Sequence, residues 1–396
     1  MINRWIKLLI LVGICSGCVT KNVSSNNVPI LETYGESVPN TEILDVSVIV
    51  LQPGISDVET SDSVFPEIRR AEATYIALQL SNELDDQGVW GATRVVPDAS
   101  HASDLTISGK ILVSNGETLA IEITAKDSRG RVWLKDEYSD TTNDLVYQHK
   151  ERLKRDPFQK IYRDIANDLI SKFKRLESGE RQAIRNVTKL IFARSFAPEA
   201  YRDYLSEDGD GFLTAEKLPA RNDPMIKRIA AIQVRHDVFV DTLQGHYENF
   251  SQQMEAPYDQ WRRLSHDETV ELRKLEQKAK TQLIVGSVSL LAGLAAATSD
   301  DRDTRLAGAV GIAAGGNQIK EGLLTRAEAK IHSSKLQELG RSLEADITPQ
   351  VIELEDRTVQ LSGTIEDQYS QWREILSDIY AAEIAELPTS LEQPSS

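Results

Sequence analysis

Two alternating apolar runs, joined by an Asn-Gly pair, constrain the fold of this chain more than any other feature. Alternation of apolar and polar residues is typical of strands with one buried face, and Asn115-Gly116 suits the tight turn of a hairpin. The apolar members of the two runs are Leu105, Ile107, Ile111 and Val113 before the turn, and Leu119, Ile121 and Ile123 after it. The pattern predicts a β-hairpin whose one face lies in a core.

The flanking segments extend this hairpin into a small α/β domain over residues 42–145. The β-branched run LDVSVIVL (44–51) predicts a strand, and Pro66 fits the first turn of a helix over roughly 64–87. WGATRVV (90–96) predicts a second strand, and a turn at Asp127–Gly130 leads into a last strand, RVWLKDEY. The predicted order is β-α-β-β-β-β.

The second half of the chain predicts long helices. From Asp223 onward, large side chains recur at alternating spacings of four and three, which is a heptad stripe. They are Met225, Ile229, Ile232, His236, Phe239, Leu243, His246 and Phe250. His236 and His246 are too far apart on one helix to share a metal, and we expect both in or near the core. We assign a helical region to 150–280, long helices to 320–387 and a disordered tail to 388–396. The fold class is α+β, with a mostly α-helical bundle or coiled coil after the small domain.

An apolar segment at 281–319 lies between two charged helical segments. Small residues recur there every four positions: Ser289, Gly293 and Ala297, then Ala307, Gly311 and Gly315. Such spacing lets two helices approach closely, so we expect a Gly-rich helical hairpin. Its halves reach about 28 and 21 Å, and the second falls short of the ~30 Å core of a bilayer. A tip buried in protein is favoured, while entry into a membrane or a pore wall stays open.

The first eighteen residues have the order of a secretory signal. Arg4 and Lys7 precede the apolar run LLILVGI (8–14), and small residues lead to Cys18. The run is too short to span a bilayer. Cys15-Ser16-Gly17-Cys18 resembles the cleavage box of bacterial lipoproteins at its last three positions, with Cys15 where leucine is usual. The alternatives are a plain cleavable signal, a retained signal anchor, and a redox or metal pair formed by the two cysteines.

The lipoprotein resemblance implies a cellular location and a lipid anchor. Residues 1–17 would be removed by cleavage after Gly17, and Cys18 would carry covalent lipid. Val19, in place of the aspartate that retains such proteins in the inner membrane, implies the outer membrane of a Gram-negative bacterium, with the body facing the periplasm. Residues 18–41 are rich in Asn and Ser, and we expect a flexible tether with an r.m.s. reach of ~25 Å.

The small domain carries a second resemblance, based on the strand after the tether and the meander DLTISGKI…NGETLAIEITAKDSRGRVW (104–133). It loosely resembles the α/β domains of periplasmic envelope-assembly lipoproteins, such as the curli-secretion lipoprotein, activators of penicillin-binding proteins and auxiliary lipoproteins of transport systems. The resemblance implies a protein that binds partners or assembles and is not an enzyme. We therefore expect membrane contact through the lipid, and protein partners or homo-oligomers through the helices.

Charge limits the partners further. The formal net charge is -16, which argues against nucleic acid and against electrostatic docking on anionic lipid, and the sequence contains no long Lys/Arg block that would favour either. Motifs of catalytic sites are lacking, and we expect no cofactor beyond the lipid.

SEDGDGFLTAEKL (206–218) partly matches a calcium loop through Asp208 and Asp210, but Lys217 stands at the twelfth position and Glu216 is one residue off. An Asp/Gly-rich turn is favoured. Three functions remain: an accessory or scaffold lipoprotein of an envelope or secretion system, an oligomeric pore or export-channel subunit, and a calcium-responsive binding module.

Overall fold

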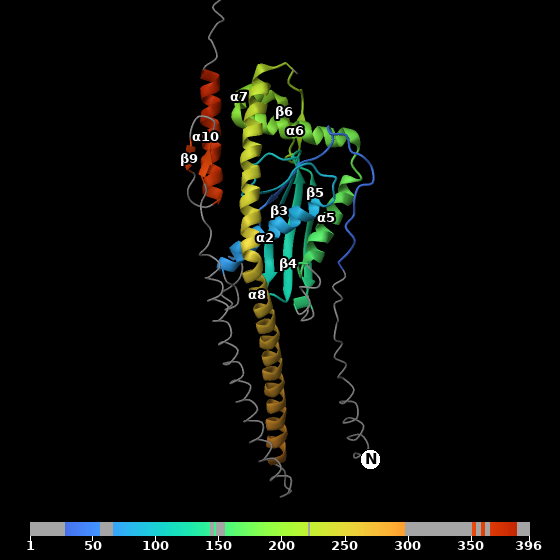
Figure 1. The fold of residues 1–396 in the computed structure, drawn as a ribbon. Coiled ribbons are helices and arrows are strands. Elements are labelled where there is room, and N and C mark those ends of the chain that lie inside the picture. The colour runs from blue at the N-terminus through green and yellow to red at the C-terminus, as the bar shows by residue number, and fades with distance from the viewer. Residues whose placement is uncertain are drawn as a thin grey trace, which may run out of the picture.

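A five-stranded sheet forms the centre of the body (Figure 1). The computed structural model describes residues 28–55, 66–142, 146–147, 155–220, 222–297, 351–353, 358–360 and 365–385. The strands are β1 (Val46–Ile49), β2 (Thr93–Val96), β3 (Leu105–Ser114), β4 (Thr118–Asp127) and β5 (Val132–Thr141), in the spatial order β2-β1-β3-β4-β5. β1 is parallel to both of its neighbours, whereas β3, β4 and β5 form an antiparallel meander. The small α/β domain is confirmed.

One face of the sheet is apolar and covered by two helices, α2 (Pro66–Asp85) and α5 (Gln159–Phe173). Most of the predicted alternating residues are buried on this face, including Ile107, Ile111 and Ile121. Val113 is an exception, with 39% of its side chain exposed. The register of β3 and β4 shifts between Ile111 and Val113, and such a bulge breaks the alternation of faces.

Residues after α5 build a cap on the body. It consists of α6 (Ser178–Phe196), α7 (Pro198–Tyr201), the short 3-10 helix η1 (Arg202–Tyr204) and a hairpin of β6 (Leu205–Glu207) and β7 (Leu213–Ala215). The hairpin lies inside the 150–280 region that we expected to be helical. A second hairpin, β8 (Val351–Glu353) with β9 (Thr358–Gln360), interrupts the long helices expected over 320–387. β-Branched residues in both of its strands favour extended backbone, which explains that difference.

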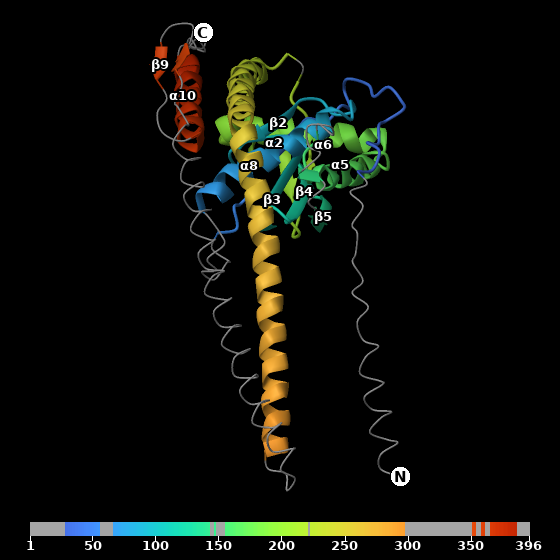
Figure 2. The ribbon, with the colours of Figure 1, turned by 60° about the horizontal axis from the view of Figure 1, so that its bottom comes forward.

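The longest element is α8 (Pro224–Ala297), a single helix of 74 residues that runs past the body (Figures 1 and 2). Its heptad stripe packs inward, with Ile232 and Phe239 buried. α10 (Ile365–Ala385) lies beside its first half. Trp372 of α10 stacks on Phe239 at a ring distance of 4.8 Å, and the Tyr380 hydroxyl contacts Met225 Sδ. Because the later residue of α10 meets the earlier residue of α8, the two helices are antiparallel.

α8 also covers the free edge of β2. The Gln244 side chain pairs with the backbone of Val95 in both directions: Val95 N–H donates to Oε1 at 2.8 Å, and Nε2 donates to the Val95 carbonyl at 2.8 Å. One side-chain amide thus replaces the neighbouring strand that this edge lacks. An edge satisfied in this way no longer templates further strands.

The chain segment before β1 lies fixed against α5 and α6. Asn167 Nδ2 donates to the carbonyl of Ile30, Glu32 N–H donates to Asn167 Oδ1, and Lys174 pairs with Glu32 at 2.8 Å. Further along, Arg181 pairs with Glu42 at 2.8 Å, and both side chains are largely buried. We call residues 28–42 the strap. The expectation of a flexible tether over 18–41 is therefore wrong for residues 28–41, because polar side chains of α5 and α6 bind its backbone.

Candidate functional site

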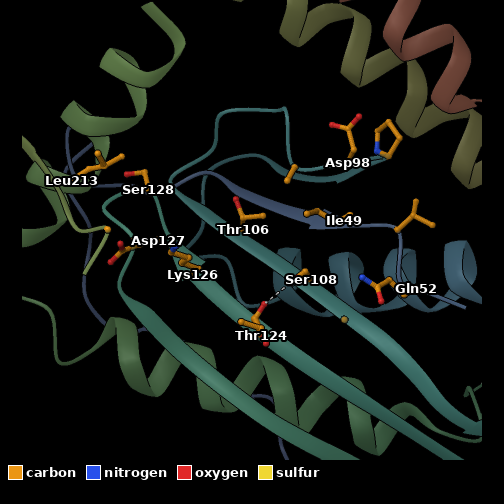
Figure 3. Close-up of a pocket in the computed structure, with 16 residues that line it drawn as sticks. Ile49, Gln52, Asp98, Thr106, Ser108, Thr124, Lys126, Asp127, Ser128 and Leu213 are labelled. Atoms are coloured by element: carbon orange, nitrogen blue, oxygen red, sulfur yellow. Dashed lines mark hydrogen bonds between the residues drawn. The ribbon is translucent and has the colours of Figure 1, made fainter. Parts of the chain in front are cut away.

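A cavity of about 680 Å³ opens on the sheet face opposite α2 (Figure 3). Its floor is polar because Thr106 and Ser108 of β3 and Thr124 and Lys126 of β4 alternate with residues buried on the other face. The rim comes from the end of β1, the loop after β2, the β4–β5 turn and the β6–β7 hairpin, through Ile49, Val50, Gln52, Pro97, Asp98, Ala99, Asp127, Ser128, Gly130, Gly211 and Leu213.

The floor of this cavity offers hydroxyl groups for hydrogen bonding. Ser108 Oγ donates to the Thr124 carbonyl at 3.4 Å. Within the described residues, the cavity lining includes neither histidine nor cysteine. Three charged residues line the cavity: Lys126, Asp98 and Asp127. The arrangement suits contact with a polar chain or ligand surface.

The most heavily buried charges lie where α8 crosses the body. The Arg262 guanidinium, 1% exposed, donates to Asp156 Oδ2 at 2.8 Å and to Asp259 Oδ1 at 2.9 Å. It also lies over the Tyr258 ring at 4.3 Å from the centroid. The Tyr75 hydroxyl of α2 donates to the same Asp156 oxygen at 2.8 Å. One carboxylate therefore joins α8, α2 and the start of α5.

A buried carboxyl from α2 makes a second connection to α8. Glu72 is fully buried, and its Oε1 accepts hydrogen bonds from Ser114 Oγ at 2.6 Å and from the Tyr258 hydroxyl at 2.9 Å. Burial raises the pKa of Glu72, and the nearby Arg69 guanidinium opposes that rise. Charge buried with this many partners holds elements in a defined geometry.

The turn of the β3–β4 hairpin completes the contact. Ser265 Oγ and Thr269 Oγ1 of α8 both donate to the Asn115 carbonyl, at 2.9 and 3.0 Å. Arg273 then pairs with Glu117 at 2.6 Å. We call this set of contacts the α8 clamp, which comprises Glu72, Asn115, Glu117, Asp156, Tyr258, Arg262, Ser265, Thr269 and Arg273. The clamp grips α8 near its middle and leaves its last turns beyond the body.

A pair of buried histidines lies at the other end of the α8 contact. His101, from the loop after β2, places Nδ1 at 3.0 Å from His236 Nε2 on α8. The Tyr369 ring of α10 and the Phe192 ring of α6 pack on His236. Burial lowers the pKa of His101 to about 4 and that of His236 to about 3, with the Arg94 and Arg373 guanidinium groups adding to both shifts. Both rings are neutral at pH 7, so the pair is a structural contact of four elements.

Several of the sequence-predicted site residues fall outside the described residues. Gly17 and Cys18 do so, as do Ala307, Gly311, Gly315 and the tail at 388–396. Ser289, Gly293 and Ala297 lie in the final turns of α8, whose backbone is helical to Ala297. None of the helices that the structure describes combines the length and hydropathy needed to cross a membrane.

The calcium-like segment forms the β6–β7 hairpin. Asp208 Oδ1 accepts the N–H groups of Asp210 and Phe212 at 3.0 and 2.9 Å, so this carboxylate closes the turn. Glu216 instead accepts a hydrogen bond from Ser206 Oγ. In the part of the chain that the structure describes, no group of three or more acidic, histidine or cysteine side chains has the spacing of a metal site.

Neither the clamp nor the histidine pair follows from a sequence pattern. Asp156 and Arg262 are separated by 106 residues, and His101 and His236 by 135. The heptad stripe placed His236 on the inner face of α8, whereas neither Asp156 nor Arg262 belonged to a predicted pattern. The chain matches no protein-family model and no curated protein.

Proposed function

We propose that this chain is a non-enzymatic, lipid-anchored scaffold of the outer membrane of a Gram-negative bacterium, with its body facing the periplasm. In this role the α/β body holds a long helix in a fixed direction for assembly of an envelope or secretion structure. The lipid on Cys18 supplies the anchor, and the helical pair of α8 and α10 supplies a bundle or coiled coil for protein partners or homo-oligomers.

One observation carries the proposal: α8 is clamped at its middle and continues beyond the body as an unbroken helix. Past Arg273, whose pair with Glu117 is the last contact of the clamp, 24 residues remain to Ala297. They extend about 36 Å at 1.5 Å per residue. A catalytic site needs no such projection, whereas a spacer or scaffold does.

The anchor is tested by metabolic labelling with a palmitate analogue, followed by separation of inner and outer membranes. We expect label on the parent chain in the outer-membrane fraction and none on the Cys18→Ala variant. Label that survives Cys18→Ala, or a chain that is released without lipid, would refute the anchor.

The scaffold role is tested on an exposed apolar pair of α8. Val234 and Val238 lie one helical turn apart and are 63% and 60% exposed. We expect the double substitution Val234→Asp with Val238→Asp to dissociate the complexes that the detergent-extracted protein forms. Native gels measure the size of these complexes. Glu248→Gln, at an exposed polar position of the same helix, is the matched control. Complexes of unchanged size in the double variant would count against partner binding by α8.

A second candidate, an oligomeric export-channel subunit, draws on the apolar end of the same helix. It differs from the scaffold in one measurement. A channel subunit forms closed rings of identical chains after mild extraction, whereas a scaffold is recovered with other proteins or as a small oligomer.

A further inference from the structure

A second, smaller cavity lies where four elements meet: α6, α8, α10 and the loop after β2. It has a volume of about 30 Å³, which is room for one or two species the size of a water molecule. Its wall is largely apolar, and its polar lining residues are Ser100, Ser195, His236 and Arg373. Ser100 is exposed, whereas His236 is 4% exposed. The cavity therefore reaches from the surface to a buried imidazole.

One nitrogen of the His236 ring is paired and the other is not. Nε2 lies 3.0 Å from His101 Nδ1 and 3.4 Å from the Tyr369 hydroxyl, and neither of these residues lines the cavity. Nδ1 is buried, and within the described residues it has no hydrogen-bond partner. A buried nitrogen without a protein partner calls for a ligand or an ordered water.

The contacts of Tyr369 decide which nitrogen of His236 carries the proton. The Ser100 hydroxyl donates to the phenol oxygen of Tyr369. Tyr369 is fully buried, so its own hydroxyl proton needs an acceptor, and His236 Nε2 lies within reach of it. We therefore assign Nε2 as an acceptor, to which His101 Nδ1 also donates. Neutral His236 then carries its proton on Nδ1, as an N–H donor without an acceptor.

The charge at the cavity is positive. Among the described residues that line it, Arg373 is the one ionised side chain at pH 7. In the part of the chain that the structure describes, its guanidinium has no carboxylate partner. Asp98 and Asp237 act on nearby Tyr369, but neither lines the cavity. A guanidinium and an N–H donor beside a small cavity favour a negatively charged ligand over water, because charge-assisted hydrogen bonds are the stronger ones.

We propose that this cavity binds one small monovalent anion, such as chloride, between the Arg373 guanidinium and the Nδ1–H group of His236. The single guanidinium balances one negative charge. The two donors come from α10 and α8, so the bound anion stabilises the contact between the two helices to which the scaffold proposal assigns partner binding. The inference goes beyond that proposal and requires neither the lipid on Cys18 nor a protein partner.

Thermal unfolding tests the site on the full-length, detergent-extracted protein. Sodium chloride replaces sodium gluconate at constant ionic strength, because gluconate is too large for the cavity and the exchange leaves charge screening unchanged. We expect the melting temperature of the parent to rise by about 2–4 °C and then to level off, as it does for a ligand that binds the folded state.

Three variants locate the effect. Arg373→Gln should remove the rise, whatever its own melting temperature. Ala102→Leu fills the cavity, leaves Arg373 in place and should remove the rise as well. Arg263→Gln is the matched control, because it removes the same charge from an exposed position of α8, and it should keep the rise. A rise retained in either cavity variant would overturn the site.

Chloride-35 nuclear magnetic resonance measures the binding itself. Chloride that exchanges with a protein site gives a broader resonance than free chloride. We expect excess linewidth with the parent and Arg263→Gln, its loss on addition of bromide, and none of it with Arg373→Gln or Ala102→Leu. A parent protein without bromide-sensitive broadening would overturn the proposal even if a cavity variant failed to fold, and would leave water as the occupant of the cavity.

Discussion

The Arg262 guanidinium of α8 donates to the Asp156 carboxylate at 2.8 Å, with 1% and 6% of the two side chains exposed. Among the ion pairs of the described residues that join α8 to the body, none is as deeply buried on both sides. The pair fixes the position of α8 against the body. The first two predictions concern this contact.

Loss of one member of the pair should weaken the α8 clamp and lower the stability of the protein. Asp156→Asn leaves the Arg262 charge buried with only Asp259 beside it, and breaking such a pair costs about 3–5 kcal/mol. We expect that loss in the free energy of unfolding measured with urea. Arg263→Ala, next to it on the exposed side of α8, should change the free energy by less than about 0.5 kcal/mol. Equal effects of the two substitutions would show that the buried pair has no special role.

The hairpin turn should tolerate no side chain at its glycine. Gly116 has a φ of +76°, and a Cβ there would lie 2.4 Å from the Arg262 carbonyl oxygen of α8. Gly88 has a similar φ of +65° with nothing within 4 Å of an added Cβ. Gly88→Ala should therefore cost about 1 kcal/mol from backbone strain alone. Gly116→Ala should cost about 1–3 kcal/mol more because α8 must move. Similar melting temperatures for both variants would contradict this contact.

Acid should loosen the contact between α8, α10 and the loop after β2. The folded state keeps His101 and His236 neutral, with pKa values of about 4 and about 3, against 6.5 for an ordinary histidine. The unfolded chain binds more protons between pH 6.5 and about 4, so stability falls as the pH is lowered through that range. We expect a loss of about 2 kcal/mol per histidine between pH 7 and pH 5.

One carboxyl group has the opposite effect on stability in the same pH range. Burial raises the pKa of Asp237 to about 6, so protonation of this group favours the folded state as the pH falls. The measurement is therefore the difference between the parent chain and His101→Gln in urea unfolding at both pH values. The variant should lose less stability than the parent on acidification. Identical pH dependence would remove the histidine pair as the cause.

The β6–β7 turn distinguishes a structural aspartate from a calcium ligand. Asparagine retains the oxygen that accepts the N–H groups of Asp210 and Phe212, so Asp208→Asn should keep the stability of the parent. Asp208→Ala loses both bonds and should cost about 1 kcal/mol. Calorimetric titration with calcium should give no heat with any of the three proteins. Calcium-dependent stabilisation of the parent, lost in both variants, would instead restore the calcium-responsive module.

The parts of the fold that depend on local pattern could be predicted from the sequence. The Asn115-Gly116 hairpin, the helix before Gly88 and the inward stripe of α8 each follow from residues close in the chain. Val113 was assigned to the core face because alternation carries no sign of a bulge. The strap was assigned to a flexible tether because its composition is polar, and polar composition does not show that Asn167 and Lys174 bind it.

The site depends on distant pairs, and these leave no periodic signal. Asp156 is one of many charged residues between predicted helices, and its burial follows only from the crossing of α8 over α2. His236 was correctly expected in the core, yet its partner His101 lies in a loop whose path the sequence does not indicate. Prediction from pattern therefore reached the elements and, for the histidine pair, one of the two residues.

The strap also orders events in the life of the chain. Its partners are synthesised much later than the strap itself, since Glu32 pairs with Lys174 across 142 residues and Arg181 with Glu42 across 139. Until α5 and α6 have emerged and packed, residues 28–42 remain as slack next to the N-terminus. Docking of the strap therefore depends on completion of α5 and α6, so an ordered strap marks a body that has folded.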